Sequence, residues 1–268
     1  MPKVQSPKFG DGTTYSTTDR PLENKPLGQR AHRSPADVGH STLDIRLTVT
    51  DLRKSFHSPD GERLEVLRGI SFSARPGETI AIVGASGAGK STLLHLIGGI
   101  EAPDHGSIKL GGFAIESASR AELARYRNRQ VGVVFQFHHL LPDLTAAENV
   151  CFPLILARQS RRPALRSAHE ALDRVGLGSR ASHRITDLSG GEQQRIAVCR
   201  ALIAEPLLVL ADEPTGNLDS ISGGLIETEL MAYAASRPAI LIIATHSQAL
   251  AGRCDRLLTL EGGRFTGN

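Results

Sequence analysis

The sequence predicts an α/β fold in three parts: a small antiparallel β region, a β-α core, and a helical segment inserted into that core. Three observations support this prediction. Residues 43–74 alternate between apolar and polar side chains over short runs, which is typical of half-buried strands. Later apolar runs rich in β-branched residues alternate with helical patterns. A glycine-rich loop at residues 84–92 joins one such run to a helix.

Length and composition limit the class of protein. At 268 residues and 40% hydrophobic content, the chain is long enough for one large α/β domain or two small ones. No apolar run approaches the ~20 residues that span a bilayer. The N-terminus also lacks the apolar stretch of a secretory signal, so we do not expect secretion. A net charge of +3 gives no case for a nucleic-acid partner. Three widely spaced cysteines lack disulfide or metal spacing, so we expect a soluble protein in a reducing, cytosolic compartment.

Residues 1–42 differ in kind from the rest of the chain. They are polar and rich in Pro, Gly, Ser and Thr, so they cannot bury enough apolar surface to offset chain entropy. We expect a disordered extension, with a membrane-surface or regulatory role as the alternative. Residues 43–268 are expected to form the folded domain.

The region before the glycine-rich loop predicts a small antiparallel sheet. Two short strands are expected at residues 66–67 and 70–73, before a turn at residues 75–77. The apolar side chains that alternate on one face of an earlier strand are Leu43, Ile45, Leu47 and Val49.

The loop itself matches the phosphate-binding pattern G-x-x-x-x-G-K-[ST], between an apolar strand at residues 80–83 and a helix at residues 92–97. Glycines allow consecutive N–H groups to point at one anion, and the helix N-terminus adds a favourable dipole. Lys90 would reach the β- and γ-phosphates, and Ser91 would place its hydroxyl on Mg²⁺. An ordinary glycine turn is the alternative, but the flanking strand and helix favour a nucleotide site. The residues of this site are Gly84, Ala85, Ser86, Gly87, Ala88, Gly89, Lys90, Ser91 and Thr92.

The remaining chain predicts a β-α framework with a helical insertion between about residues 137 and 200. The expected helices cover residues 119–129, 145–159 with a kink at Pro153, 163–175 and 189–205. The expected strands cover residues 131–135, 207–211, 240–244 and 257–260.

Two acidic residues follow the apolar strand at residues 207–211. Ligands of open α/β sheets sit at the carboxyl ends of the strands, so Asp212 is positioned to help hold Mg²⁺. Glu213 is a candidate base for an attacking water. The alternative is a solvated acidic loop. The presence of the phosphate loop in the same chain favours the catalytic interpretation.

A second helix start carries a motif of its own. Ser189 with Glu192 three residues later forms a capping box, and the intervening Gly190 and Gly191 leave the helix N-terminus open to an anion. A phosphate-binding element so far from the first loop need not serve the same nucleotide within one subunit. A nucleotide held by a partner chain is the alternative.

Together these motifs resemble the nucleotide-binding domain of ABC transporters, in the family order over about residues 44–265. The elements that carry the resemblance are Gly84–Thr92, Gln136, Leu188–Arg195, Asp212–Glu213, Asn217–Asp219 and His246. The resemblance implies a P-loop NTPase (RecA-like) core with an N-terminal antiparallel β subdomain and an inserted α-helical signature subdomain. It also implies ATP hydrolysis with Mg²⁺.

The resemblance further implies a head-to-tail homodimer that holds two ATP molecules between one subunit's phosphate loop and the other's signature. The signature residues that would act in trans are Ser189, Gly190, Gly191 and Glu192. Of the remaining site residues, the resemblance makes His246 a γ-phosphate ligand in cis, Gln136 a sensor of Mg²⁺ and water, and Asp219 a link between the two sites. Phe56 would stack on adenine or belong to the core. The family usually has an acidic residue where this chain has Ser247, which leaves the orientation of His246 open.

A narrower resemblance concerns the segment Phe135–Val150, which is similar to the lipoprotein-releasing ATPases of Gram-negative bacteria. It implies a peripheral protein at the cytoplasmic face of the inner membrane, beneath integral membrane permease subunits. Related macrolide or peptide efflux and cell-division ATPases are the alternative. A soluble ABC protein acting on ribosomes or DNA fits less well, because the chain has one cassette. Leu140 and Leu141 are predicted to form a contact surface for the membrane subunits, with a place in the core as the alternative.

Overall fold

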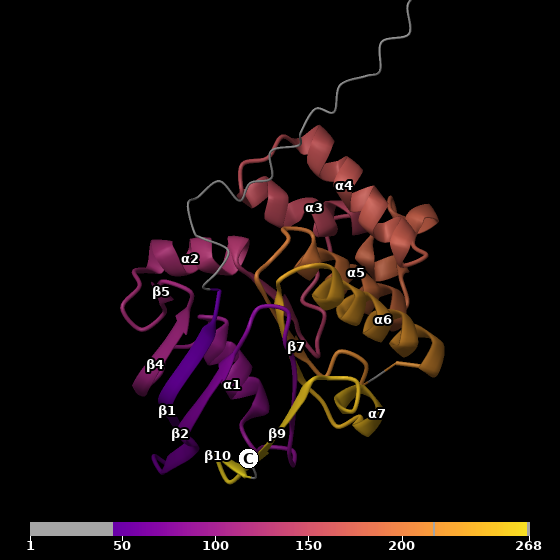
Figure 1. Ribbon diagram of the computed structural model, residues 1–268. Helices are drawn as coiled ribbons and strands as arrows, with labels where there is room; N and C mark the ends of the chain where they lie inside the picture. The colour runs from indigo at the N-terminus through magenta and orange to yellow at the C-terminus, as the bar shows by residue number, and fades with distance from the viewer. Residues whose placement is uncertain (1–44, 217, 267–268) are drawn as a thin grey trace, which may run out of the picture. The chain divides into compact units, whose positions relative to one another are not determined.

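The computed structural model describes residues 45–216 and 218–266 (Figure 1). The expected polar extension and Leu43 therefore lie outside the described residues. The described part contains two β-sheets, one antiparallel with four strands and one mainly parallel with six. Within it, no helix is both long and apolar enough to cross a bilayer.

The antiparallel sheet has the strand order β2-β1-β4-β5. Its strands are β1 (Leu47–His57), β2 (Arg63–Ala74), β4 (His105–Leu110) and β5 (Phe113–Ala114). The predicted inward face is confirmed, since Ile45, Leu47 and Val49 are buried. The two short strands expected at residues 66–67 and 70–73 are one continuous strand, because β2 pairs with β1 along its length and absorbs local irregularities as register shifts.

The second sheet has the order β10-β9-β3-β8-β7-β6, with parallel pairing everywhere except at the β10–β9 edge. Its strands are β3 (Thr79–Val83), β6 (Val131–Val134), β7 (Leu208–Asp212), β8 (Ile240–Ala244), β9 (Arg256–Glu261) and β10 (Arg264–Thr266). All strands predicted in this part of the chain are confirmed to within two residues at either end. Because β3, β6, β7 and β8 are parallel, the loops that follow them meet at one edge of the sheet.

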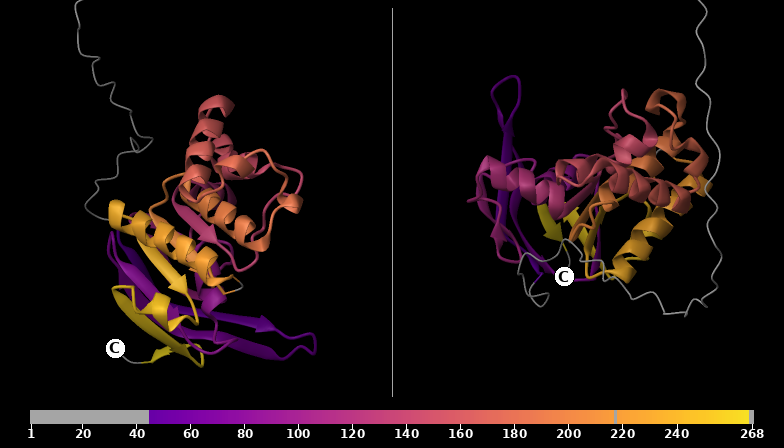
Figure 2. Two further views of the ribbon diagram at one scale, coloured as in Figure 1. Left: turned by 90° about the vertical axis from the view of Figure 1, so that its right-hand side faces the viewer. Right: turned by 90° about the horizontal axis from the view of Figure 1, so that it is seen from above.

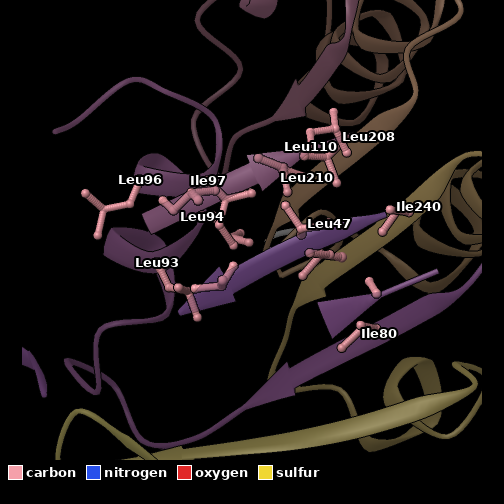
Figure 3. Packing of buried hydrophobic residues seen from close by; sticks show 14 of the residues in the cluster. Leu47, Ile80, Leu93, Leu94, Leu96, Ile97, Leu110, Leu208, Leu210 and Ile240 are labelled. Carbon is pink, nitrogen blue, oxygen red and sulfur yellow. The ribbon is translucent and has the colours of Figure 1, made fainter. Parts of the chain in front are cut away.

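Helix α1 (Lys90–Ile97) lies in the core between the two sheets. Its side chains Leu93, Leu94, Leu96 and Ile97 belong to one buried cluster together with Leu47 of β1, Ile80 of β3, Leu208 and Leu210 of β7, and Ile240 of β8 (Figure 3). Each such side chain contributes about 1.5–3 kcal/mol by burial. The glycine loop that precedes α1 is therefore held by the packing of its helix against both sheets.

Three helices form a second core away from the sheets (Figure 2). They are α3 (Ala146–Leu156), α4 (Arg161–Arg174) and α5 (Gly190–Leu202). Two 3₁₀ turns, η1 (Gly178–Arg180) and η2 (Ile185–Asp187), lie between α4 and α5. Their buried cluster includes Val150, Ala168, Leu172 and Ile196 and no residue of either sheet. The predicted helical insertion is confirmed, and helix α3 continues through Pro153.

The other helices cover the parallel sheet or link the two sheets. They are α2 (Arg120–Arg129), α6 (Ser220–Ser236) and α7 (Gln248–Ala251). Helix α6 buries Ile226, Leu230 and Tyr233 in a cluster with Val209 and Ala211 of β7. The helix predicted at residues 119–129 is confirmed as α2, which begins at a capping box formed by Ser119 and Glu122.

Asn149 fastens the turn that leads into α3. The side chain is fully buried, accepts a hydrogen bond from Leu141 N (2.8 Å) and donates to Leu141 O, Leu144 O and Thr145 O. We expect Asn149→Ala to lower the free energy of unfolding by about 2–3 kcal/mol, because several part-buried backbone groups lose their partner. Calorimetry should show a melting temperature lower by roughly 5–10 °C. Asn128→Ala on α2, where the asparagine is half-buried, is the control and should stay near wild type.

Candidate nucleotide site

The glycine loop connects β3 to α1 and leaves the helix N-terminus open. Gly84 and Gly89 have φ values of 153° and 103°, which are in the region that favours glycine. A Cβ atom on Gly89 would lie 2.9 Å from a methyl carbon of Leu67. No side chain caps α1, so its first N–H groups are available to an anion. The predicted strand, loop and helix are thus confirmed.

Lys90, the first residue of α1, is buried and turns its ammonium group back over the loop. Its Nζ donates to Gly84 O (2.8 Å) and Ala85 O (3.1 Å). The same Nζ lies 3.3 Å from His246 Nε2. A cation held in this position is suited to binding phosphate oxygens that enter the loop.

Glu213 follows β7 with a strained backbone. Its φ of 45° is uncommon for a residue other than glycine, and its N–H donates to Ala244 O of the neighbouring strand β8 (2.9 Å). The carboxylate is mostly buried: Oε2 accepts from His246 N (3.2 Å), and Oε1 lies 3.2 Å from His246 Nε2. The strain therefore turns this carboxylate toward His246 and, through it, toward Lys90.

The imidazole of His246 lies between Glu213 and Lys90. Its Nε2 lies 3.2 Å from Glu213 Oε1, which is an ion-pair contact when the ring is protonated, and it can accept a hydrogen bond from Lys90 Nζ when it carries no proton. Glu213 Oε1 is buried and has no hydrogen-bond partner within the described residues. The ring is more than half exposed and accessible to a ligand.

Ser247 directly follows His246 and caps the next helix. Its hydroxyl accepts from Leu250 N (3.2 Å) as the N-cap of α7, which is the role an acidic residue would fill equally well. Ser247 N donates to Thr245 Oγ1, and the buried Thr245 donates its own N–H to Ile82 O. The serine therefore anchors the segment that presents His246.

The candidate magnesium ligands come from three different segments. Asp212 is buried at the end of β7, Ser91 is exposed in the first turn of α1, and Gln136 is exposed just after β6. Within the described residues no three His, Cys, Asp or Glu side chains are grouped as a complete metal site. A hydroxyl, an amide and one carboxylate are suitable oxygen donors for Mg²⁺ when phosphates and water complete its coordination shell.

The signature helix α5 begins as predicted. Ser189 is its N-cap, and Glu192 Oε2 accepts from Ser189 N and Ser189 Oγ, both at 2.8 Å. These hydrogen bonds from Ser189 hold the pKa of Glu192 below its usual value. A Cβ on Gly190 would meet no atom within 4 Å. Within the described residues no hydrogen bond joins this helix start to the phosphate loop.

Asp219 is the N-cap of α6. Its Oδ1 accepts from Ser222 N (2.9 Å) and Ile221 N (3.0 Å), which lowers the pKa of the carboxyl. Ser222 Oγ in turn accepts from Arg195 of the signature helix (3.0 Å). Asp219 is therefore linked to α5, whereas Asn217 lies outside the described residues.

Phe56 lies on β1 and is 37% exposed, with Lys54 Nζ 5.2 Å from its ring centroid. It is absent from the core clusters, so the alternative of a core residue is wrong. A pocket of about 340 Å³ lies beside the phosphate loop and is lined in part by Val66, Ser86 and Gly87. Stacking of Phe56 on adenine stays a prediction.

Comparison with known proteins decides the family. Residues 67–216 match the model of the ABC transporter family, which is more than half of the chain. The chain belongs to the ABC transporter family. This ATP-binding cassette is 47% identical over 218 residues to a protein of Geobacter metallireducens named lipoprotein-releasing system ATP-binding protein LolD, covering 81% of this chain and 96% of the relative. A Pseudomonas syringae pv. tomato protein of the same name is 46% identical over 219 residues, covering 82% and 96%.

Solved structures support the same assignment. The cassette resembles a dimeric post-hydrolysis state of the ATP-binding cassette MJ0796 bound to ADP and Pi, with a TM-score of 0.78 and 32% identity over 82% of this chain and 97% of that one. A second dimeric structure of MJ0796 gives a TM-score of 0.77 at the same identity and coverage. The chain is an ABC transporter ATPase with an antiparallel β subdomain and a RecA-like mixed sheet, as the sequence predicts.

Two polar side chains of α5, Gln194 and Arg200, make contacts near the site that no sequence pattern predicted. Gln194 is buried and donates to backbone carbonyls beside Gln136 and Glu213, and Arg200 donates to the carbonyls of His138 and His139. Both fall within a predicted helix, and Gln194 lies in the signature run itself. The available signal was a polar side chain on the inward face of an amphipathic helix.

Proposed function

We propose that this ABC ATPase is the ATP-hydrolysing subunit of a complex that releases lipoproteins from the inner membrane toward the outer membrane. The observation that carries the proposal is the 44–47% identity, over 81–82% of the chain, to curated proteins named lipoprotein-releasing system ATP-binding protein LolD. A related efflux or cell-division ATPase is the second candidate, and the membrane subunits that bind the chain distinguish the two.

In the proposed mechanism the cassette binds ATP through the phosphate loop, where backbone N–H groups and Lys90 hold the phosphates. Glu213 accepts a proton from the attacking water; its buried Oε1, which has no hydrogen-bond partner among the described residues, supports this role. His246 contacts the γ-phosphate and keeps Glu213 in position through its backbone N–H. Phe56 stacks on the adenine from its exposed position on β1.

The side chains proposed to hold Mg²⁺ are Ser91, Gln136 and Asp212, because all three offer hard oxygen atoms at the same edge of the sheet. When bound, the ion would neutralise phosphate charge. Asp212 is the carboxylate of this set, and its burial at the end of β7 limits its exposure to water.

The active form is proposed to be a head-to-tail homodimer. Support comes from the structural neighbours, whose titles describe dimers. It also comes from the start of α5, which makes no hydrogen bond to the phosphate loop within the described residues. In this dimer Ser189, Gly190 and Gly191 face the γ-phosphate of the partner's ATP. Asp219, through Ser222 and Arg195, links the signature helix to the loop after Glu213.

The proposed docking surface for the permease subunits follows Gln136. Phe137 and Leu141 are exposed, at 69% and 39%, whereas Leu140 packs against the helical core. The prediction that both leucines form a contact surface is therefore wrong for Leu140, because its partly buried side chain packs against the α3–α5 cluster. Leu141 keeps the proposed role, at the cytoplasmic face of the inner membrane.

Co-purification tests this proposal. The tagged chain should bring down integral membrane subunits, and vesicles that contain the complex should release lipoproteins on addition of ATP. Leu141→Glu should keep basal ATPase but lose at least about 10-fold of the recovered permease, because docking would bury a carboxylate without a partner. Leu257→Glu, at a leucine that is 56% exposed on β9, is the control and should bind normally. Recovery of efflux or cell-division subunits would instead support the second candidate.

A further inference from the structure

One buried amide on the signature helix contacts two of the motif segments. Gln194 is 2% exposed, and its Nε2 donates to Pro214 O (3.1 Å) and to Phe135 O (3.4 Å). Pro214 directly follows Glu213, and Phe135 directly precedes Gln136. A single side chain of α5 thus joins the loops after β6 and β7.

The chemistry of the contact fixes the orientation of the amide. A reversed Gln194 would direct its carbonyl oxygen at two other carbonyl oxygens, which is repulsive. In the observed orientation Oε1 has no hydrogen-bond partner within the described residues. The donor side of the amide is therefore the part that makes the connection.

Helix α5 holds the Gln136 segment at a second place. Arg200 donates from Nη1 to His139 O (2.7 Å) and from Nη2 to His138 O (2.8 Å). Gln194 and Arg200 therefore fasten both ends of the short segment that contains Gln136. Helix α5 also packs on β6 and on α6, which lies beside it in Figure 1.

We propose that Gln194 is a positioning residue for ATP hydrolysis: it holds the Gln136 and Glu213 segments in register with the signature helix of the same chain. The inference rests on the proposed roles of Gln136 and Glu213. The amide touches neither substrate nor the reacting atoms, and it acts through the backbone on both sides of the site. Small displacements of catalytic groups lower turnover steeply, while the phosphate loop that provides binding is untouched.

If Gln194 had a purely structural role, its substitution would lower stability and leave the turnover number unchanged. A buried donor to two carbonyls also contributes to stability, so its loss lowers the melting temperature in either case. Only a positioning role changes the turnover number while leaving the KM for ATP in place. The control is Tyr233→Phe, because Tyr233 OH donates to Pro206 O (2.9 Å) at the opposite end of the same strand β7.

The experiment compares the full-length variants Gln194→Met and Tyr233→Phe in steady-state ATP hydrolysis, well below their melting temperatures. Methionine keeps the length of the side chain and removes the donor. We expect Gln194→Met to lower kcat by about 10–100-fold with KM for ATP within about 2-fold. Tyr233→Phe should lose stability with kcat unchanged. If Gln194→Met does not fold, Gln194→Asn retains a buried amide that is too short to reach both carbonyls, and the same split is expected.

Glu213→Gln, measured in parallel, distinguishes a failure of the positioning role of Gln194 from a failure of the proposed base. If it loses turnover while a folded Gln194 variant keeps wild-type kcat, the positioning role is overturned and the proposed base remains. If Glu213→Gln retains turnover, the assignment of Glu213 fails. A rise in KM with unchanged kcat would also overturn the inference, because it would place Gln194 in substrate binding.

Discussion

Glu213→Gln should bind ATP with near-wild-type affinity, and its kcat should fall by about 10²–10⁴-fold. A positioned general base typically accelerates a reaction by this factor. The substitution keeps the shape of the side chain and its hydrogen bond from His246 N. It removes the negative charge that accepts a proton from water. Because ATP would then be bound without being hydrolysed, the variant should accumulate as a dimer, visible by light scattering.

Glu205→Gln is a matched control for this prediction. Glu205 also has a positive φ, of 52°, but it is exposed and paired with Arg237 (2.7 Å) away from the site. Its substitution should leave both turnover and oligomeric state unchanged. Near-normal hydrolysis by Glu213→Gln would show that another group accepts the proton.

Mixing Lys90→Ala chains with Ser189→Arg chains should restore activity that neither variant has alone. Lys90 donates hydrogen bonds to two carbonyl oxygens of the phosphate loop. Ser189 caps helix α5, whose start makes no hydrogen bond to that loop within the described residues. In a head-to-tail heterodimer both lesions fall on one composite site, and the other site is intact. Random mixing should give about a quarter of wild-type activity, since half of the dimers have one working site.

The control for this experiment mixes Lys90→Ala with Glu213→Gln. Both residues belong to the same site of one chain, so every site of the heterodimer keeps one lesion and no activity should return. Native mass spectrometry verifies that heterodimers form. If they form and the first mixture also stays inactive, either both sites must be intact for turnover or the signature does not act across the interface.

Local patterns in the sequence predicted the elements that carry the site. The strand, glycine loop and helix around Lys90 follow from β-branched residues, glycines at positions of positive φ, and apolar spacing. The capping box of Ser189 and Glu192 likewise depends on residues three apart. These features are determined by neighbouring residues, which is why they are visible before any fold is known.

Other features depend on which segments the fold brings together. The sequence suggested two short strands where β2 is continuous, because pairing with β1 overrides the local break. It left Leu140 and Leu141 equivalent, whereas the fold packs Leu140 partly buried against the α3–α5 cluster and leaves Leu141 exposed. Neither outcome is encoded in a window of a few residues.

The sequence by itself determined the α/β class, the order of the motifs and the residue types able to bind phosphate and accept a proton. Tertiary structure alone decided that His246 lies between Lys90 and Glu213, and that Gln194 joins the segments of Gln136 and Glu213. The physical reason is that these contacts join residues far apart in the chain. Parallel pairing of β6, β7 and β8 sets their positions, and no local pattern specifies which strand ends become neighbours.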